Sequence, residues 1–342
     1  MEYLLNHELP ILPAVADSWR GNPIVDGEFQ YLRDPFEVSW SPVAKMLLSP
    51  NPQRVEKKAD RWVPPVARST AYLDDRDRDW IVWLGHACFL LQLNGERYLT
   101  DPQLRDMPTV PRRVHPPLGY DELRGIDYIL LSHDHRDHVD KECLRTICAN
   151  NRVKKILTSL KMTDVIGDWV GATPIEEAAW YQQYRLPGTD VTITFLPARH
   201  WCRRGLTDFN RRLWGSFMIE TGDDAGAQTI YFGGDSAETP YWAEIGRLFP
   251  GIDVAMLGIG AYKPEYMMRE NHANPEEAFR GFRALGAKYW WPMHHGTYDL
   301  SNEPPSEPIL WASQLMQEHG LADRLVQPAI NEPWWFGTRS GG

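Results

Sequence analysis

Cysteine is scarce in this chain, and no apolar run is long enough to cross a membrane. The 342 residues include four cysteines, which are Cys88, Cys143, Cys148 and Cys202. Four cysteines do not make a disulfide framework for a chain of this length, so we expect a reducing, cytoplasmic compartment. No window of eighteen apolar residues occurs, because Gly85 and His86 interrupt the most apolar stretch, 80–93. The sequence therefore predicts no membrane span, and it leaves a peripheral membrane contact open.

Basic residues are fewer than acidic ones. The chain has 36 Lys and Arg against 46 Asp and Glu, which gives a formal net charge of −10. A protein that binds nucleic acid usually presents a basic surface, so we expect no nucleic-acid partner. The first residues also lack the basic segment and long apolar core of a signal peptide. Neither low-complexity segments nor short repeats occur.

The composition that remains is that of an ordinary globular protein with a sizeable core, 43% hydrophobic and 24% charged. Tryptophan is abundant at 15 copies. Several tryptophans adjoin candidate site residues, which suggests an aromatic wall around a pocket, although core filling explains most of them. Residues 1–78 are rich in Pro, Asp and Arg without clean periodicity. We interpret them as an N-terminal extension packed on a main domain, 79–342, with a short helix or apolar patch between Phe36 and Leu48.

Within the main domain, apolar segments alternate with amphipathic ones. Predicted strands cover 80–89, 90–93, 97–100, 128–131, 154–158, 191–196, 216–220, 229–232, 253–257 and 289–291. Predicted helices cover 141–149, 275–285 and 309–319. The second half repeats the plan of the first, strands and then alternating helices. Two sheets packed face to face with helices outside satisfy this order, so we expect an α/β protein with an αββα four-layer sandwich.

The segment 132–138, Ser-His-Asp-His-Arg-Asp-His, follows the apolar strand 128–131 and carries most of the chemical signal. Alternate residues of an extended chain share a face, so His133 and His135 point the same way. Asp137 and His138 lie one turn further and can reach a second ion. Imidazole and carboxylate groups at this spacing suit Zn²⁺, with Fe or Mn as alternatives. Alternatively, the segment is the polar start of a helix near residue 139, but three clustered histidines rarely have a purely structural packing role.

Three later strands each end in a further candidate ligand. His200 follows 191–196, Asp235 follows 229–232 and His294 follows 289–291. Each is weak alone, because a single histidine at a strand end is more often structural. In this order after the first motif they predict two ions. His133, His135 and His200 would bind one ion, and Asp137, His138 and His294 the other, with Asp235 bridging both.

The chain resembles the metallo-β-lactamase fold superfamily and, within it, the N-acylphosphatidylethanolamine-hydrolysing phospholipase D family and its bacterial relatives. The segments that carry the resemblance are 83–87, 99–102, 132–138, 200–204, 212–216, 234–235, 259–262, 274–278 and 294–297. His-Trp-Cys-Arg-Arg at 200–204 and Leu-Trp-Gly-Ser at 213–216 are more specific to the family than the metal motif. The resemblance implies an αββα sandwich with a dinuclear zinc site, hydrolysis of a phospholipid phosphodiester, and a homodimer.

The resemblance also implies that Arg203 faces the phosphate and that His272 lies near the reacting centre. Arg203 could instead pair with a surface acid, and His272 could cap a helix. We expect Asp101, at a strand end, to orient a ligand histidine. His86 is either a similar supporting residue or a buried turn histidine. His295 should face the substrate groove or support the site, because neighbouring residues of an extended strand point to opposite sides.

The expected reaction is hydrolysis of a phospholipid or small phosphodiester. Two ions would lower the pKa of a bridging water, which attacks phosphorus, with Asp137 and Asp235 holding the ions. Arg203 would neutralise charge on the phosphate, and His272 would protonate the leaving alkoxide. A lactone or amide hydrolase is the main alternative, because the same ions can polarise a carbonyl. The acidic net charge disfavours an RNA-processing nuclease. A non-catalytic binding protein would normally have lost metal ligands.

Overall fold

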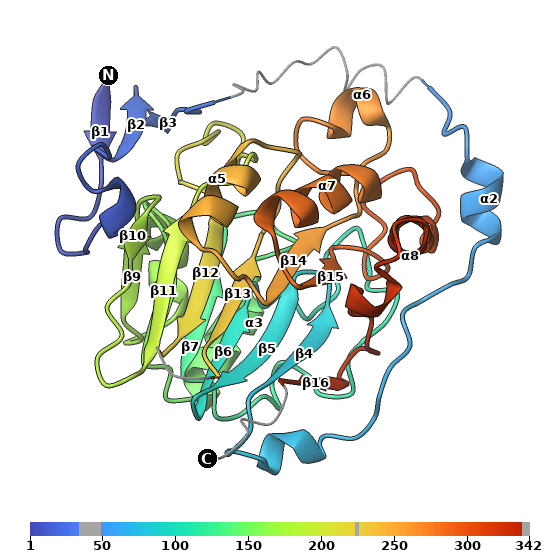
Figure 1. Ribbon diagram of the computed structural model, residues 1–342, viewed down its shortest axis with the longest axis horizontal. Coiled ribbons are helices and arrows are strands. Elements are labelled where there is room, and N and C mark those ends of the chain that lie inside the picture. The colour runs from blue at the N-terminus through green and yellow to red at the C-terminus, as the bar shows by residue number, and fades with distance from the viewer. Residues whose placement is uncertain (34–48, 223–225, 337–342) are drawn as a thin grey trace.

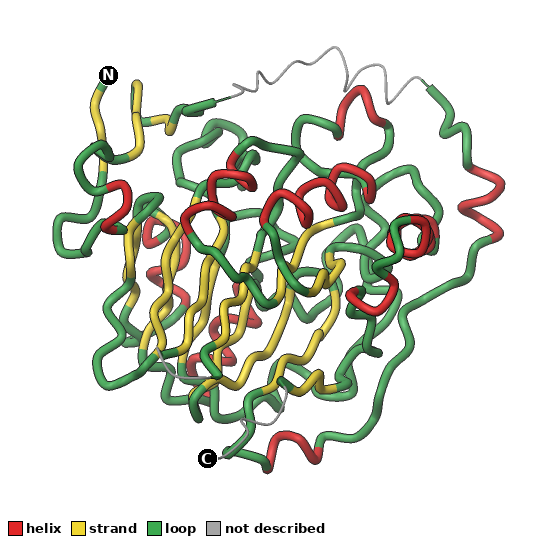
Figure 2. Tube along the Cα trace, viewed as in Figure 1, coloured by secondary structure: helices red, strands yellow, loops and turns green. Residues whose placement is uncertain are grey.

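Two mixed β-sheets packed face to face form the body of the protein, and helices cover both outer faces (Figure 1). The computed structural model describes residues 1–33, 49–222 and 226–336. Figure 2 shows the strands gathered in the middle and the helices outside them. This is the expected αββα arrangement.

The larger sheet has seven strands and comes mainly from the first half of the main domain. In spatial order the strands are β16 (Pro333–Trp335), β4 (Trp80–Gly85), β5 (Cys88–Leu93), β6 (Glu96–Thr100), β7 (Tyr128–Leu131), β8 (Lys155–Ser159) and β9 (Ile175–Ala178). Pairing is antiparallel from β16 to β6 and parallel from β6 to β9. The parallel strands β6 and β7 therefore end at the same edge of the sheet.

The smaller sheet has six strands from the second half. In spatial order they are β10 (Gln182–Gln183), β11 (Val191–Leu196), β12 (Ser216–Thr221), β13 (Gln228–Phe232), β14 (Val254–Gly258) and β15 (Tyr289–Met293). Pairing is antiparallel from β10 to β13 and parallel from β13 to β15. The two sheets thus share one plan, as the sequence predicted.

Both faces of the larger sheet are buried, which explains its nearly continuous apolar strands. In β4, Ile81 and Trp83 face the core between the sheets, whereas Val82 and Leu84 face the core under α3 (Lys141–Asn150). Asp140 caps α3 by accepting a hydrogen bond from the Cys143 amide. A charged residue inside either face of β4 would have no solvent to reach.

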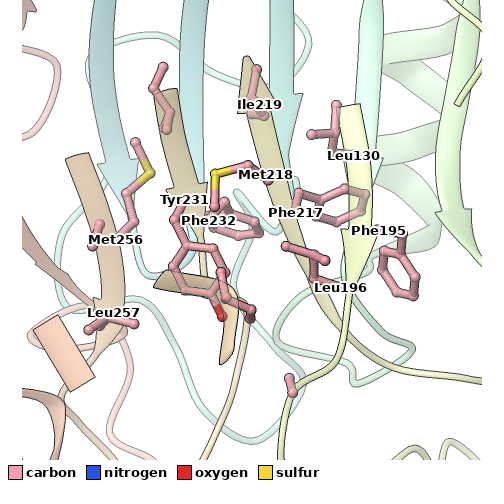
Figure 3. Packing of buried hydrophobic residues seen from close by; sticks show 14 of the residues in the cluster. Leu130, Phe195, Leu196, Phe217, Met218, Ile219, Tyr231, Phe232, Met256 and Leu257 are labelled. Carbon is pink, nitrogen blue, oxygen red and sulfur yellow. The ribbon is translucent and has the colours of Figure 1, made fainter. Parts of the chain in front are cut away.

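Aromatic side chains fill the space between the two sheets. The ring of Phe89 in β5 lies 6.2 Å from Phe232 in β13 and 5.3 Å from Trp291 in β15. Figure 3 shows residues of β11 to β14 gathered with Leu130 of β7 in the same cluster. Because these contacts join strands of different sheets, they fix the distance between the strand ends that carry the polar residues described below.

Helices α5 (Tyr241–Leu248), α7 (Pro275–Leu285) and α8 (Glu307–Glu318) pack side by side, and α7 contacts β14 of the smaller sheet. The Asn274 side chain caps α7 reciprocally with Glu277, and Gly286 ends it in the left-handed conformation. The shorter helices are α2 (Arg54–Ala59), α4 (Thr163–Ile166), α6 (Glu265–Met268) and the 3₁₀ turns Pro13–Val15, Ala71–Asp74, Gly167–Trp169 and Ala322–Arg324. In the described parts of the chain, no helix has the length and hydrophobicity of a membrane span.

The N-terminal segment forms a small three-stranded sheet, β1 (Glu2–Leu4), β2 (Asn22–Val25) and β3 (Glu28–Phe29), and then a strap along one side of the molecule (Figure 1). The strap, residues 49–67, binds the loop after β15 through bonds from Asn51 to Asn302 and from Ser306 to Asp60. The division into an extension and a main domain stays a prediction. The expected helix or apolar patch of Phe36, Val38, Trp40, Val43, Met46, Leu47 and Leu48 lies outside the described residues.

Some boundaries differ from expectation. The segment predicted as one strand from 80 to 89 turns at His86 and Ala87, so that Cys88 already belongs to β5. β9, β10, β16 and α5 were not predicted. β9 and β10, each at the edge of its sheet, are short and polar, with the sequences Ile-Glu-Glu-Ala and Gln-Gln. Such segments lack the apolar alternation that predicts a strand.

Candidate metal centre

Five strand ends converge on one edge of the sandwich, and each delivers a polar side chain. Asp101 follows β6, the segment 132–138 follows β7, His200 follows β11, Asp235 follows β13 and His294 follows β15. Asp101, His200, Asp235 and His294 are almost completely buried, as are His133 and His138 of the segment 132–138. Rigid, neighbouring strands thus bring together residues that are up to 193 positions apart in the case of Asp101 and His294.

Three imidazoles form the first group. The Nδ1 atom of His135 lies 2.9 Å from Nε2 of His133 and 3.0 Å from Nε2 of His200. Together with a carboxylate oxygen of Asp235, these atoms lie within 4.8 Å of one another. The structure therefore brings together the residues that the sequence assigned to one ion.

The second group surrounds the carboxylate of Asp137. Its Oδ2 atom lies 3.6 Å from Nε2 of His138, 3.4 Å from Nε2 of His294 and 3.0 Å from Nε2 of His86. These four ligand atoms lie within 4.8 Å of one another. His86, which the sequence suggested as a supporting or turn residue, thus contacts the carboxylate of this group directly.

Asp235 lies between the two groups. Its Oδ2 atom is 3.1 Å from His138 Nε2 and 3.2 Å from His294 Nε2, and 3.7 Å from His200 Nε2 and 3.9 Å from His133 Nε2. Its Oδ1 atom is buried and has no hydrogen-bond partner in the described chain. One carboxylate therefore contacts imidazoles of both groups, and its bridging role stays a prediction.

The far nitrogen of most of these rings has a second partner that fixes the ring. Asp101 Oδ2 lies 2.8 Å from Nδ1 of His138 and also accepts a bond from the Ser132 hydroxyl. The Ser132 hydroxyl lies 2.9 Å from Nδ1 of His133. His200 donates from Nδ1 to the carbonyl of Asn271 at 3.0 Å. Such partners hold the tautomer and the orientation of a metal-binding imidazole.

Sequence reasoning proposed Asp101 for this role but missed Ser132 and Asn271. The Ser132 signal was available, because a hydroxyl directly before His133 at a strand end can reach a ring nitrogen. The Asn271 contact uses only a backbone carbonyl, and no side-chain pattern reveals such a partner.

Backbone strain concentrates at the same edge. His86, Asp101 and His294 have φ values of 55°, 32° and 60°, in the left-handed region that side chains other than glycine rarely adopt. Such conformations cost of the order of 1–3 kcal/mol each and persist where the surrounding structure holds them. Three of them around one cluster indicate a functional rather than a packing role.

The two groups differ in protonation. Burial lowers the pKa of the His133 and His200 imidazoles well below the usual value, with neighbouring imidazoles adding to the effect. Burial also opposes the cation of His294, but Asp235 and Asp137 outweigh it and raise the pKa of His294 to about 9. The same carboxylates raise the pKa of His138. Asp137 and Asp235 thus favour positive charge at His138 and His294.

The donor set fits divalent metal ions. Borderline nitrogen donors with carboxylate oxygens are the ligands of zinc and related ions, and no thiolate is present among the donor groups. Several buried donor atoms, including His135 Nε2, His294 Nε2 and Asp235 Oδ1, have no hydrogen-bond partner in the described chain. Buried polar atoms are rarely left in this state, so the cluster is suited to hold cations.

His272 lies beside the cluster, and His295 faces away from it. The Nδ1 atom of His272 is 3.7 Å from Asp235 Oδ2, and its ring is 5.2 Å from those of His200 and His294. The ring of His295 stacks between Trp62 and Trp83 at 6.0 and 5.3 Å. His294 and His295 therefore point to opposite sides of the strand end, as expected. His295 also lines a cavity of about 250 Å³ formed with Trp62, Trp83 and Trp291.

Arg203 lies in the loop after His200, but its guanidinium binds that loop. Its Nε and Nη2 atoms donate to the carbonyls of Gly205 and Leu206 at 2.9 and 3.1 Å. A contact with phosphate would exchange these bonds for charged ones. The phosphate role of Arg203 thus stays a prediction.

The sandwich of two mixed sheets and a histidine and aspartate cluster at the strand ends define a metal-dependent hydrolase of the metallo-β-lactamase fold. A family model described as "Beta-lactamase superfamily domain" matches residues 96–295, which is more than half of the chain. The chain therefore belongs to the β-lactamase superfamily. This range contains the whole cluster except His86.

The chain is similar to one relative of named activity, to an uncharacterized protein and to solved structures of the same fold. "N-acyl-phosphatidylethanolamine-hydrolyzing phospholipase D 1" of Caenorhabditis elegans is 32% identical over 233 residues, which cover 64% of each chain. The matched part thus spans slightly less than two thirds of that relative. An uncharacterized protein of Mycobacterium tuberculosis is 32% identical over 290 residues, 79% of this chain and 75% of that protein. Among solved structures, Igni18, a metallo hydrolase from Ignicoccus hospitalis, has a TM-score of 0.56 at 19% identity, covering 76% of this chain and 98% of that one, which shows the fold alone.

Proposed function

We propose that the protein is a dinuclear zinc phosphodiesterase that cleaves phospholipids of the N-acylphosphatidylethanolamine type or related phosphodiesters. The observation that carries the proposal is the shared position of Asp235, whose Oδ2 atom lies within 3.9 Å of four imidazole nitrogens from the two groups. A carboxylate between two sets of donors is what two neighbouring ions require.

His133, His135 and His200 would hold one ion and Asp137, His138 and His294 the other, with Asp235 contacting both. When bound, two ions would activate a water and neutralise charge on a phosphoryl oxygen. His86 would orient Asp137 through its Nε2 atom rather than complete a shell, because their 3.0 Å separation is that of a hydrogen bond. Asp101 would orient His138 in the same way.

His272 is the candidate for proton transfer. Burial lowers the pKa of His272 to about 4, so its imidazole is neutral near pH 7. A neutral ring accepts the proton of the attacking water more readily than it donates one, and it can return that proton to the leaving oxygen. This refines the expectation that His272 acts only as a proton donor.

The surroundings of the cluster suit an amphiphilic substrate. His272 lines a pocket of about 90 Å³ with Lys263 and Arg269. Lys263 pairs with Glu307, and Arg269 pairs with Glu265 and Glu277, so a phosphate would exchange with these carboxylates. The loop after His200 carries the half-buried rings of Trp201 and Phe209, 5.6 Å apart, and Leu206, which is 89% exposed. An apolar loop near the cluster matches a substrate with an acyl chain, which agrees with the substrate in the name of the Caenorhabditis elegans relative.

A substrate panel tests this proposal. The zinc-loaded protein should hydrolyse N-acylphosphatidylethanolamine in mixed micelles and, more slowly, bis-p-nitrophenyl phosphate. The Asp235→Asn variant serves as the inactive control. Cleavage of lactones or amides without cleavage of either phosphodiester would replace the proposal by the carbonyl-hydrolase alternative.

A further inference from the structure

A buried carboxylate that belongs to neither metal group lies between two of the candidate ligands. Asp134 stands between His133 and His135 and is completely buried. Its Oδ2 atom accepts a hydrogen bond at 2.7 Å from Nε of Arg212, whose Nη2 atom binds the same oxygen. Its Oδ1 atom accepts a hydrogen bond at 2.9 Å from the backbone amide of Arg203. Asp134 therefore joins the segment after β7 to the loop that begins at His200.

Arg204 strengthens the same connection from the other side. Its Nη1 atom donates to the carbonyls of Asp134 and Val139 at 2.6 and 2.9 Å, with a longer contact of 3.4 Å to that of His135. One guanidinium nitrogen thus gathers carbonyls from the turn that carries the first motif. Arg204 is half-buried, and its guanidinium supplies hydrogen bonds that the backbone carbonyls of a turn need.

Asp208 closes the arrangement within the loop. Its Oδ2 atom accepts from Nη2 of Arg212, and its Oδ1 atom accepts at 2.7 Å from the Gly205 amide. Arg212 is therefore held between two carboxylates, with 7% of its side chain exposed. We call Asp134, Arg204, Asp208 and Arg212 the clamp.

The geometry explains which ligands the clamp controls. On an extended segment, His133 and His135 share one face and Asp134 faces the other, so fixing Asp134 fixes the direction of both imidazoles. The Arg203 amide that binds Asp134 is three residues beyond His200. The three imidazoles of the first group thus lie on two segments that the clamp ties together.

The second group has separate supports. His138 is oriented by Asp101, and His294 follows β15, which is held in the smaller sheet. Within the described residues, no hydrogen bond or ion pair of the Asp134 or Arg212 side chains reaches Asp137, His138 or His294. A loss of the Asp134–Arg212 pair should therefore act on one metal position and not on both.

We propose that Asp134 and Arg212 are positioning residues that set the affinity of the His133, His135 and His200 position for its ion. This inference rests on the proposed two-ion centre. It goes beyond that centre because it assigns a role to residues that contact no ion. Supporting residues of this kind typically change metal affinity about 10- to 100-fold.

The test is a zinc titration with a competing chelator on the full chain. Asp134→Asn removes the charge but keeps the shape of the side chain. It should lower the affinity for one of the two ions about tenfold or more, while the affinity for the other ion changes less than twofold. The Glu176→Gln variant is the control, because it breaks the half-buried Lys155–Glu176 pair on the same sheet away from the clamp. This control should leave the affinity for both ions unchanged, whatever its effect on thermal unfolding.

Two backgrounds identify the affected ion. In His294→Ala, which retains the first position, Asp134→Asn should weaken the remaining ion by the same factor. In His200→Ala, which retains the second position, Asp134→Asn should have no further effect. Arg212→Lys, which keeps the charge but loses the two-pronged contact, should give an intermediate weakening and serves as the test if Asp134→Asn does not fold.

Equal weakening of both ions, or unchanged affinity in Asp134→Asn and Arg212→Lys, would overturn the clamp. A wild-type protein that binds fewer than two ions would instead overturn the proposed function on which the clamp rests. The two failures are thus distinguished by the wild-type stoichiometry alone.

Discussion

The two metal groups share Asp235 but differ in charge, and this difference decides how readily each group binds a cation. The first group consists of three imidazoles whose pKa values are lowered, chiefly by burial. The second contains the Asp137 carboxylate, and its two ligand imidazoles have raised pKa values because Asp137 and Asp235 favour the cation. The first group is therefore ready for an ion near neutral pH, whereas the second must first release protons.

The two groups also differ in how they are held. In the first, Ser132 and the Asn271 carbonyl fix two rings, and the clamp ties their segments together. In the second, Asp101 fixes His138. In the described part of the chain, the far nitrogen of one ring in each group, His135 Nε2 and His294 Nδ1, has no partner, so the clamp makes the difference. We conclude that the first position is the more preorganised one.

The largest effect is expected at Asp235, because both groups share this residue. Asp235→Asn removes the negative charge that both groups use, so the protein should lose at least one of two ions and nearly all hydrolase activity. Elemental analysis after gel filtration, together with activity against bis-p-nitrophenyl phosphate, measures both. A variant with two ions and full activity would show that Asp235 is not shared.

Removing one ligand from each group should separate them. His200→Ala should lose the ion of the first group, and His294→Ala that of the second, leaving about one ion per chain in each case. His295→Ala is the matched control for His294, because its ring stacks between Trp62 and Trp83. Retention of two ions in His294→Ala with a loss in His295→Ala would reverse our register at this strand end.

Asp101→Asn should affect the second group more than the first, because Asp101 contacts His138 directly and His133 only through the Ser132 hydroxyl. The variant keeps a hydrogen-bond acceptor near His138 Nδ1 but loses its charge, and we expect a 10- to 100-fold loss of affinity for one ion. Chelator competition in the His200→Ala and His294→Ala backgrounds tells which ion is affected. A loss confined to the first group would contradict the assignment.

Arg203→Ala tests whether Arg203 contacts the phosphate of the substrate. If Arg203 leaves its loop carbonyls to bind phosphate, the variant should lower phosphodiester turnover about tenfold, since a charge-assisted contact is worth roughly 1.5–3 kcal/mol. Both ions should remain bound. Wild-type turnover in the variant would show that Arg203 only stabilises its own loop.

The smallest effect is a shift with pH. As pH falls through about 9, His294 gains a proton that competes with the ion of the second group, and the raised pKa of His138 acts in the same direction. The apparent affinity for this ion should therefore fall about tenfold per pH unit for each proton that the ion displaces. The imidazoles of the first group stay neutral over this range. Zinc titrations between pH 6 and 9 should therefore show one pH-dependent and one nearly constant ion, and parallel loss of both would contradict the protonation difference.

Much of the fold could be predicted from the sequence, because apolar segments of the right length mark buried strands. The bounds of β7, β11 and α7 agree with the predicted 128–131, 191–196 and 275–285. The short edge strands β9 and β10 could not be predicted, since their residues are polar and their pairing depends on neighbours distant in sequence.

Some site residues, like some strands, could be predicted from the sequence, and others could not. His133, His135, His138, His200, Asp235 and His294 could be found because each stands at a strand end. The direct contact of His86 with Asp137 depends on the turn between β4 and β5, whose geometry the sequence did not indicate. Asp134 and Arg212 are 78 positions apart and become partners only when β11 and β7 lie in packed sheets.

The most direct test of the two-ion centre is a crystal structure of the zinc-loaded protein with anomalous diffraction at the zinc edge. Our account predicts two peaks about 3.5–4 Å apart. One should lie against His133, His135 and His200, the other against Asp137, His138 and His294, with Asp235 touching both. A single peak, or two peaks without Asp235 between them, would contradict it.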